Sequence, residues 1–284
     1  MKLNEYYRQY LSKLGLIYVE NEASNITKMV FESLANISRA DVIRNPEMEI
    51  ESEIFSSLNQ ALDQLLNHQP IQYVLGEAWF YHLKFKVSEA VLIPRPETEE
   101  LVEIAIQHLK KTYQKKALDI GTGSGCIPIS IKKNVPEINI TSVDLSAKAI
   151  DIASENANNH QTKIDFKALD FLDENNWGNL DVYDVIISNP PYIPKLEIQS
   201  MDKHVTEFEP HLALFVPDED PLLFYKAILR FAQNHLDKNG NIFLETHENF
   251  ADDVCALFKE AGYEAKVKND LFEKPRMVLI NRFH

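Results

Sequence analysis

Residues that could hold a flat polar group stand together in "ISNPPYIPK", residues 187 to 195. Asn189 ends a hydrophobic run, and two prolines and Tyr192 follow it. The Asn189 side-chain oxygen and the Pro190 main-chain carbonyl are two hydrogen-bond acceptors, and Pro190 and Pro191 hold them rigidly because proline fixes φ. This pair could accept both N–H groups of an amide, or of an amine on an aromatic ring, while Tyr192 stacks on its plane.

Such a turn suits the transfer of a group to a weakly nucleophilic nitrogen. An –NH2 conjugated to a carbonyl or a ring has a delocalised lone pair, so its reactivity depends on how it is oriented. Orientation can lower a barrier by about 7–11 kcal/mol, against about 3–5 kcal/mol for a general base. The nitrogen can lose its proton after the transfer. We therefore require no base, and because the sequence has no nucleophile–base pair we expect no covalent intermediate.

A glycine-rich turn, "ALDIGTGSGCIPISI", is the second chemical signal. It lies between a predicted strand and a predicted helix, where main-chain N–H groups at the helix start can bind a carboxylate or phosphate. Glycines there leave the main chain open to a ligand. The candidate cofactor-binding residues of this turn are Gly121, Thr122, Gly123, Ser124 and Gly125.

Acidic residues end the next two predicted strands. Asp144 lies about 20 residues beyond the glycines, where an acid accepts hydrogen bonds from ribose hydroxyls. Asp170 closes the following strand beside Phe171, and together they could contact the amine and the ring of an adenine. Because the carboxyl ends of parallel strands meet at one edge of a sheet, these residues favour an adenosine-type cofactor. Asn189 ends the fourth strand at the same edge.

The elements that position these residues alternate between strands and helices from residue 116 onward. This alternation predicts an α/β domain over residues 97–284 with a doubly wound, mostly parallel sheet. The last two strands leave no room for a helix between them, so one of them is expected to run antiparallel. Apolar residues at helical spacing predict a small helical bundle over residues 1–70. Residues 71–96 predict a β-hairpin linker, with its turn at Ser88 and Glu89.

The composition is that of an ordinary globular protein, with 45% hydrophobic and 25% charged residues in a chain of 284. A net charge of −14 argues against nucleic-acid binding, since phosphates require a basic surface. Only Cys126 and Cys255 are present, which favours a reducing cytoplasm over a disulfide framework. We expect neither a signal peptide nor a membrane span. His204, His211 and His247 lack metal-ligand spacing, so no metal is expected.

The glycine turn differs from the G-x-G-x-x-G spacing of nicotinamide enzymes. Its form, Gly-Thr-Gly-Ser-Gly after Asp119, resembles the class I S-adenosylmethionine-dependent methyltransferases, and this resemblance covers residues 97–284. It implies a seven-stranded sheet. It also implies that the loop approaches the methionine moiety of S-adenosyl-L-methionine, that Asp144 holds the ribose, and that Phe171 flanks the adenine. The product of the cofactor would be S-adenosyl-L-homocysteine.

The segment "QPIQYVLGEAWFYHLKFKVSEAVLIPRPETEELV", residues 69–102, is more specific. It resembles the release factor glutamine methyltransferases, whose Leu-Ile-Pro-Arg-Pro-Glu-Thr-Glu run is present from Leu92 to Glu99. "FEPHLAL", "KNDLFEKPRMVL" and the helical N-terminus also match. The resemblance implies N5-methylation of the glutamine in the Gly-Gly-Gln motif of class I peptide chain release factors. It further implies that the helical domain recognises the release factor, that Asn189 touches both cofactor and substrate, and that Asn189 to Tyr192 hold the glutamine.

Two positions depart from that pattern, and several readings stay open. Asp220 stands where a glycine is usual, and "LETHENF" replaces the usual glycine and glutamine after Glu245. Arg95 and Glu97 could touch substrate or could fix the hairpin to the first helix. A ribosomal-protein glutamine or an adenine in DNA or RNA would be alternative substrates, although the latter would need a basic groove. A non-catalytic S-adenosylmethionine-binding module of the translation machinery is a third reading. The acidic surface favours a basic partner.

Overall fold

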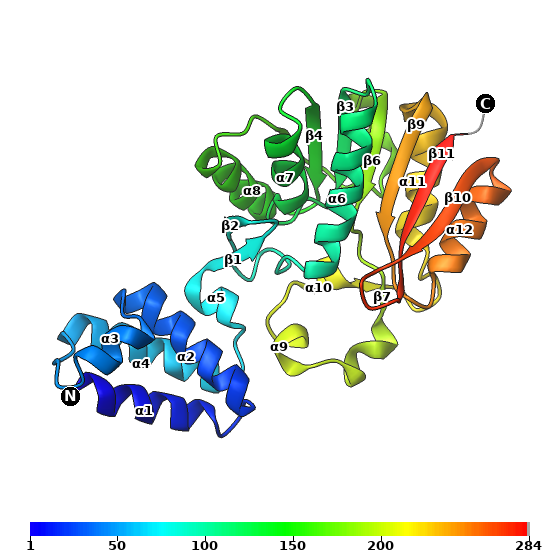
Figure 1. The fold of residues 1–284 in the computed structure, drawn as a ribbon. Coiled ribbons are helices and arrows are strands. Elements are labelled where there is room, and N and C mark those ends of the chain that lie inside the picture. Colours follow the sequence, from blue (N-terminus) through cyan, green and yellow to red (C-terminus); the bar gives the residue numbers. More distant parts are fainter. Residues whose placement is uncertain (283–284) are drawn as a thin grey trace. The chain divides into compact units, whose positions relative to one another are not determined.

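The computed structural model describes residues 1–282, and its chain divides into two compact units (Figure 1). The first unit comprises Met1–Glu77 together with Asp202–Phe208, and the second comprises Ala78–Met201 and the chain from Glu209 onward. Residues 202–208 therefore belong with the N-terminal unit, although the sequence predicted them within the catalytic domain. No helix in the described part of the chain is long and apolar enough to cross a membrane.

The first unit is helical, which confirms the prediction for this region. Leu3, Tyr10 and Leu14 are fully buried on one side of α1, at the three- to four-residue spacing of an amphipathic helix. They pack with Phe31 of the second helix in one apolar cluster. The helices of this unit are α1 (Leu3–Leu14), α2 (Glu20–Ala35), α3 (Arg39–Arg44), α4 (Ser52–Leu66), α5 (Ile71–Leu75) and the short α9 (Lys203–Thr206).

The second unit is built on a seven-stranded sheet with the order β10-β11-β9-β6-β3-β4-β5. The pairs formed by β9, β6, β3, β4 and β5 are parallel, and β11 is antiparallel to both of its neighbours. The predicted mostly parallel sheet with one reversed strand is thus confirmed. Its strands are β3 (Lys116–Ile120), β4 (Asn139–Asp144), β5 (Asp165–Ala168), β6 (Tyr183–Ser188), β9 (Leu236–Glu245), β10 (Tyr263–Asn269) and β11 (Pro275–Arg282).

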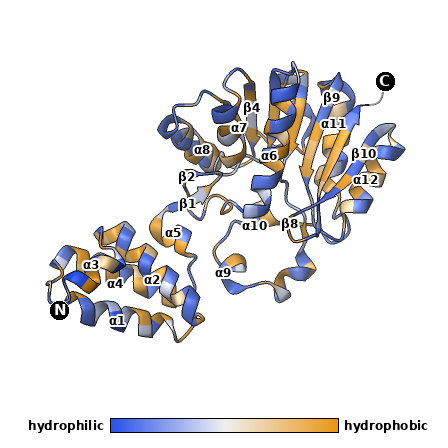
Figure 2. Ribbon diagram, viewed as in Figure 1, coloured by the Kyte–Doolittle hydropathy of each residue, from blue (hydrophilic) through white to orange (hydrophobic). Residues whose placement is uncertain are grey.

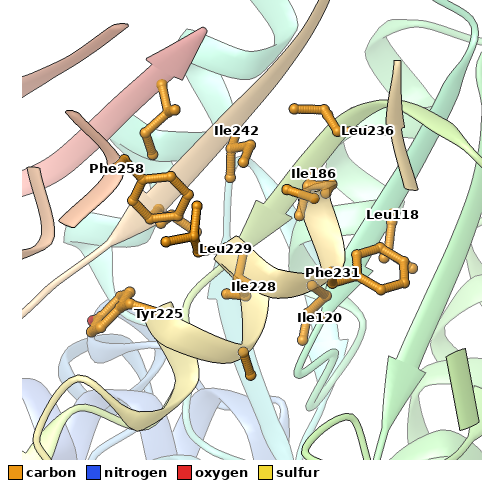
Figure 3. Packing of buried hydrophobic residues seen from close by; sticks show 14 of the residues in the cluster. Leu118, Ile120, Ile186, Tyr225, Ile228, Leu229, Phe231, Leu236, Ile242 and Phe258 are labelled. Atoms are coloured by element: carbon orange, nitrogen blue, oxygen red, sulfur yellow. The ribbon is translucent and has the colours of Figure 1, made fainter. Parts of the chain in front are cut away.

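Helices cover both faces of this sheet, as the alternating side chains of its strands require. Leu118 and Ile120 of β3 point into one apolar cluster, and Ala117 points into the other. The first cluster lies under α11 and α12 (Figure 3), and the second lies under α6 and α7. Hydrophobic residues are prominent in β9, near the middle of the sheet, whereas β10 at its edge is largely hydrophilic (Figure 2). The long helices are α6 (Pro96–Lys111), α7 (Cys126–Asn134), α8 (Ala147–Asn159), α11 (Leu223–His235) and α12 (Ala251–Glu260).

A two-stranded hairpin, β1 (Glu77–Phe80) and β2 (Leu83–Lys86), precedes α6. Its turn is formed by Tyr81 and His82, both at positive φ, and not by Ser88 and Glu89 as the sequence predicted. Positive φ is unfavourable for such side chains. The turn is stabilised from α6, because the Tyr81 main-chain N–H donates to Glu99 and the Tyr81 hydroxyl donates to Glu103.

The segment between β6 and α11 contains short elements that the sequence did not predict. The strand β7 follows the Asn-Pro-Pro-Tyr turn directly and pairs in parallel with β8. This pairing anchors the far side of the turn within the second unit. The short elements here, and one before β6, are η1 (Glu174–Asn179), β7 (Ile193–Pro194), η2 (Lys195–Ser200), α10 (His211–Leu214) and β8 (Phe215–Val216).

Candidate active site

The predicted site residues lie at the carboxyl ends of neighbouring strands. Ile120, the last residue of β3, is paired with Val143 of β4 and with Ser188 of β6. Ser188 is also paired with Leu244 of β9. The residues that come next, Gly121, Asp144, Asn189 and Glu245, therefore share one edge of the sheet. A methyl group built on Gly121 would lie 3.8 Å from the Asn189 main-chain oxygen, so the glycine turn and the Asn-Pro-Pro-Tyr turn are adjacent.

The three glycines of the turn all have positive φ, at 79°, 53° and 79°, but they serve different purposes. A Cβ on Gly123 would meet no atom within 4 Å, so the space beside it is open to a ligand. A Cβ on Gly125 would lie 3.0 Å from Ile129 Cδ1 and 3.1 Å from Ala153 Cβ. Gly125 is thus required for the close packing of α7 against α8, whereas Gly121 and Gly123 leave room at the turn.

Asp144 is tied to the glycine turn. Its Oδ2 accepts a hydrogen bond of 2.9 Å from the Gly123 N–H, and its Oδ1 accepts one of 2.9 Å from the Ser146 N–H. Burial raises the pKa of Asp144, and the two N–H donors oppose that rise. Each carboxylate oxygen keeps a further lone pair. The side chain can therefore accept hydrogen bonds from a diol while its orientation is fixed by the main chain.

A second acid, Asp119, lies beneath the turn and is 1% exposed. The Ser142 hydroxyl donates to Asp119 Oδ2 at 2.5 Å and lies 2.6 Å from the Thr122 hydroxyl. Burial raises the pKa of Asp119 to about 7, against the effect of these hydroxyls. Thr122 and Ser124 are both buried, and the Ser124 hydroxyl has no hydrogen-bond partner in the described chain. These side chains support the turn from below.

Asp170 and Phe171 differ in how far they match their predicted role. Asp170 follows β5 and accepts a hydrogen bond of 2.9 Å from the Leu172 N–H, and its side chain is partly exposed. Phe171 is 5% exposed, and its ring centroid lies 5.7 Å from that of Trp177 and 5.2 Å from that of Phe231. The Phe171 ring belongs to the hydrophobic core under α11, so its face is not open for an adenine to stack on.

The Asn-Pro-Pro-Tyr turn is fixed by residues from two other elements. Asn189 Nδ2 donates to the hydroxyl of Thr98, in the first turn of α6, at 3.0 Å. The Thr98 hydroxyl donates to Glu245 Oε2 at 2.7 Å. The Tyr192 hydroxyl donates to the other carboxylate oxygen, Oε1, at 3.2 Å. One buried carboxylate at the end of β9 thus holds both ends of the turn.

Two oxygen atoms of the turn take no part in this network. Within the described residues, neither Asn189 Oδ1 nor the Pro190 carbonyl accepts a hydrogen bond. Pro190 and Pro191 stiffen the main chain between Asn189 and Tyr192. The turn therefore carries two oxygen atoms that could accept hydrogen bonds, and their predicted role in binding a substrate amide stays a prediction.

Arg95 is not free at the site. Its guanidinium lies 2.5 Å from Glu209 Oε1, and Glu209 Oε2 accepts a hydrogen bond of 3.1 Å from the Ile93 N–H. Glu209 belongs to "FEPHLAL", so this ion pair joins two of the segments that the sequence singled out. These contacts tie Arg95 to the segment before α10, and they test neither of the roles left open for it, contact with substrate or attachment of the hairpin to α6. Among residues 1–282, no group of histidines, cysteines and acids is placed to hold a metal ion.

Three further residues of the network were missed by sequence reasoning as site residues: Thr98, Glu245 and Tyr225. The Tyr225 hydroxyl, from α11, donates to the Glu245 main-chain oxygen at 3.0 Å. One signal could have found Glu245: it is an acid at the end of an apolar strand, the same signal that selected Asp144. Thr98 lies within a quoted motif but carries no chemical signal of its own.

The comparisons with known proteins agree with this geometry. Residues 99–208 match the family model described as "Methyltransferase small domain", and residues 5–76 match the one described as "PrmC N-terminal domain". A solved structure of ribosomal protein L11 methylase from Lactobacillus delbrueckii subsp. bulgaricus superposes with a TM-score of 0.50 at 16% identity. That match covers 70% of this chain and 84% of the other. The sheet order and the strand-end site define a class I methyltransferase fold.

Relatives that align with nearly the whole chain show to which family within this class it belongs. The chain is 37% identical over 285 residues to the release factor glutamine methyltransferase of Flavobacterium psychrophilum. It is 38% identical over 284 residues to that of Streptococcus pneumoniae. Both matches cover 99% of each chain. The protein belongs to the release factor glutamine methyltransferase family.

Proposed function

We propose that this protein transfers a methyl group from S-adenosyl-L-methionine to the side-chain amide nitrogen of the glutamine in the Gly-Gly-Gln motif of class I peptide chain release factors. One observation carries the proposal. Asn189 Oδ1 and the Pro190 carbonyl stand on a rigid turn beside the glycine loop, and neither accepts a hydrogen bond from the described chain. Two acceptors of this kind match the two N–H groups of a carboxamide.

The residues at the sheet edge suit S-adenosylmethionine, which supplies an electrophilic methyl group when bound. The open space beside Gly123 admits the ligand to the main chain of the turn. The remaining lone pairs of Asp144 would accept the ribose hydroxyls. Asp170, which is partly exposed after β5, would accept the adenine amine. Gly121 to Gly125 would line the methionine end of the cofactor, with Asn189 next to it. Phe171 would support the adenine side of the site through its main chain and its packing in the core.

The Asn-Pro-Pro-Tyr turn would act by orienting its substrate. Asn189 and Pro190 would accept the two amide hydrogens, which fixes the plane of the glutamine amide. Tyr192, whose ring is held through its hydroxyl, would stack on that plane together with Pro191. Orientation of this kind can provide about 7–11 kcal/mol of the barrier reduction. The nitrogen would release its proton after methyl transfer, so no general base is assigned.

Each of the three parts of the chain has its own role in the proposed function. We propose that residues 1–70 recognise the release factor, that residues 71–96 link the two parts, and that residues 97–284 bind the cofactor and catalyse the transfer. The net charge of −14 favours a basic protein surface as partner over nucleic acid. We propose that the protein meets this substrate in the cytoplasm.

Mass spectrometry tests the assignment. Purified protein is incubated with S-adenosylmethionine and a release factor, and the tryptic peptide that carries the Gly-Gly-Gln motif is analysed. We expect a gain of one methyl group on the glutamine and no gain when that glutamine is replaced by alanine. A ribosomal protein and a DNA duplex serve as competing substrates. Methylation of either of these, with an unmodified release factor, would overturn the proposal.

A further inference from the structure

In the hydrogen-bond network behind the Asn-Pro-Pro-Tyr turn, Glu245 determines which group of each hydrogen bond donates and which accepts. Glu245 is 1% exposed at the end of β9, and each of its carboxylate oxygens meets one hydroxyl group. One hydroxyl comes from Thr98 in α6, and the other comes from Tyr192 in the turn. A single buried carboxylate therefore couples the start of a helix to the turn that ends the neighbouring strand.

The chemistry of the donors and acceptors fixes how Asn189 must lie. A carboxylate only accepts hydrogen bonds, so the Thr98 hydroxyl has to donate its one proton to Glu245. The Thr98 oxygen can then only accept from Asn189, 3.0 Å away. Only the –NH2 end of the Asn189 amide can donate. Nδ2 is thereby directed to Thr98, and Oδ1 is left facing away from the network.

We propose that Glu245 and Thr98 are positioning residues: Glu245, acting through Thr98, holds the Asn189 amide so that its oxygen is presented to the substrate nitrogen. The inference rests on the proposed function, because a carboxamide substrate needs acceptors at this position. An Asn189 amide turned by 180° would present its own –NH2 to the –NH2 of the substrate, and the acceptor pair would be lost. The same carboxylate fixes the ring of Tyr192 at the other end of the turn.

The orientation of the Asn189 amide depends on whether Glu245 is charged, and the groups around Glu245 affect that charge. The ionisable and charged groups that face it come from α6, the turn, α11 and β11: Glu97, Tyr192, Tyr225 and Arg276. Burial raises the pKa of Glu245 to about 7, and the hydrogen bonds that it accepts and the charge of Arg276 oppose the rise. A protonated Glu245 would itself be a donor. Thr98 could then donate to Asn189, which reverses the direction of the network.

Substitution of Thr98 tests the link without changing the charge at the site. Thr98→Val keeps the shape of the side chain and removes the hydroxyl, and Thr98→Ser restores it. We expect kcat for release-factor methylation to fall about 10–100-fold in Thr98→Val, because a misplaced acceptor costs up to about 100-fold. The KM for S-adenosylmethionine should change by less than about threefold, and Thr98→Ser should recover most of kcat.

Thr246 provides a matched control. It follows Glu245 directly and is fully buried, and its hydroxyl has no hydrogen-bond partner in the part of the chain that the structure describes. Thr246→Val should leave kcat within about twofold of the wild type. If Thr98→Val retains as much kcat as Thr246→Val, Thr98 does not position Asn189 and the proposal is wrong.

The pH profile separates orientation from a merely structural role of Glu245. In the wild type, kcat should rise with pH and level off above about 7, because only the carboxylate directs Thr98 as required. Glu245→Gln can accept on one side only, so its kcat should be lower and nearly constant between about pH 6 and 8. A profile with the wild-type rise in Glu245→Gln would overturn the assignment.

A spectroscopic readout is independent of the substrate. The side-chain –NH2 of Asn189 is identified in a ¹⁵N-labelled protein by its loss in Asn189→Asp, and its hydrogen exchange is measured. We expect exchange to become at least about tenfold faster in Thr98→Val and unchanged in Thr246→Val. An unchanged signal in Thr98→Val refutes the network even if release factors are methylated. A wild-type protein that methylates no release factor instead refutes the proposed function, and the exchange data still decide whether Thr98 directs Asn189.

Discussion

The ion pair between Arg95 and Glu209 yields a quantitative prediction for stability. The Glu209 side chain is 1% exposed and that of Arg95 is 32% exposed, so removing Arg95 leaves a buried carboxylate with only the Ile93 N–H as partner. Breaking a buried pair costs about 3–5 kcal/mol. Because water can reach the position of Arg95, we expect the lower end, about 3 kcal/mol, for Arg95→Met.

The expected shifts differ between the two partners. Glu209→Gln keeps an acceptor for the Ile93 N–H and leaves a cation that water can solvate, so it should cost only about 1–2 kcal/mol. The double variant should cost less than the sum of the two single changes. For a unit of about 200 residues, 1 kcal/mol shifts Tm by about 2–4 °C, so Arg95→Met should lower Tm by about 6–12 °C.

Tryptophan fluorescence during urea unfolding is the assay, because it reports on the second unit alone. Both tryptophans of the chain, Trp79 and Trp177, lie in that unit. Arg230→Met is the matched control: Arg230 pairs with Glu174 at 2.7 Å, but both side chains are about half exposed, so it should cost less than about 1 kcal/mol. If Arg95→Met is no more destabilising than Arg230→Met, the reasoning about burial is wrong.

Four further outcomes are expected from the contacts at the site. Burial raises the pKa values of Glu245 and Asp119 to about 7, so the folded state holds extra protons below that pH. The free energy of unfolding should therefore fall as pH rises from about 5 to 7, by on the order of 1 kcal/mol or more. The fall should be smaller in Glu245→Gln, and urea titrations at several pH values measure it. Asn189→Ala should lower kcat by about 100-fold or more and weaken cofactor binding only modestly, as single-turnover kinetics and calorimetry can determine. Gly125→Ala should destabilise the protein by about 1–3 kcal/mol through its contacts and positive φ. Gly123→Ala has the strain of positive φ but no close contact, so it should be less destabilising than Gly125→Ala and should reduce cofactor affinity by about tenfold in a calorimetric titration.

The sheet could be predicted from the sequence because its signals are local. Strand–helix alternation, the glycine turn and the acid of Asp144 each occupy a short segment, and the rule that parallel strands end at one edge brings them together. The reversal of β11 was also predictable, since too few residues separate it from β10 for a crossover helix.

The structure differs from the sequence-based prediction where residues far apart in the chain determine the local conformation. The hairpin turn at Tyr81 and His82 contains no glycine or asparagine, and its conformation depends on Glu99 and Glu103 of α6. Phe171 has the position of a cofactor contact, but its ring packs in the core against Phe231, which lies far along the chain. The network of Thr98 and Glu245 likewise joins three segments that no single-sequence pattern relates.

The place of β11 has a consequence for synthesis on the ribosome. Although its residues follow β10 in the chain, β11 lies between β9 and β10 and pairs with both of them (Figure 1). A nascent chain that has not yet released residues 275–282 exposes an unpaired edge on β9, which invites aggregation. In a purified variant truncated after residue 270, β9 should be cleaved by protease more readily than in the chain that contains β11. Glu245, which holds the turn that is proposed to bind the substrate amide, is itself paired with Met277 of β11, so the site depends on a strand that is made after β10.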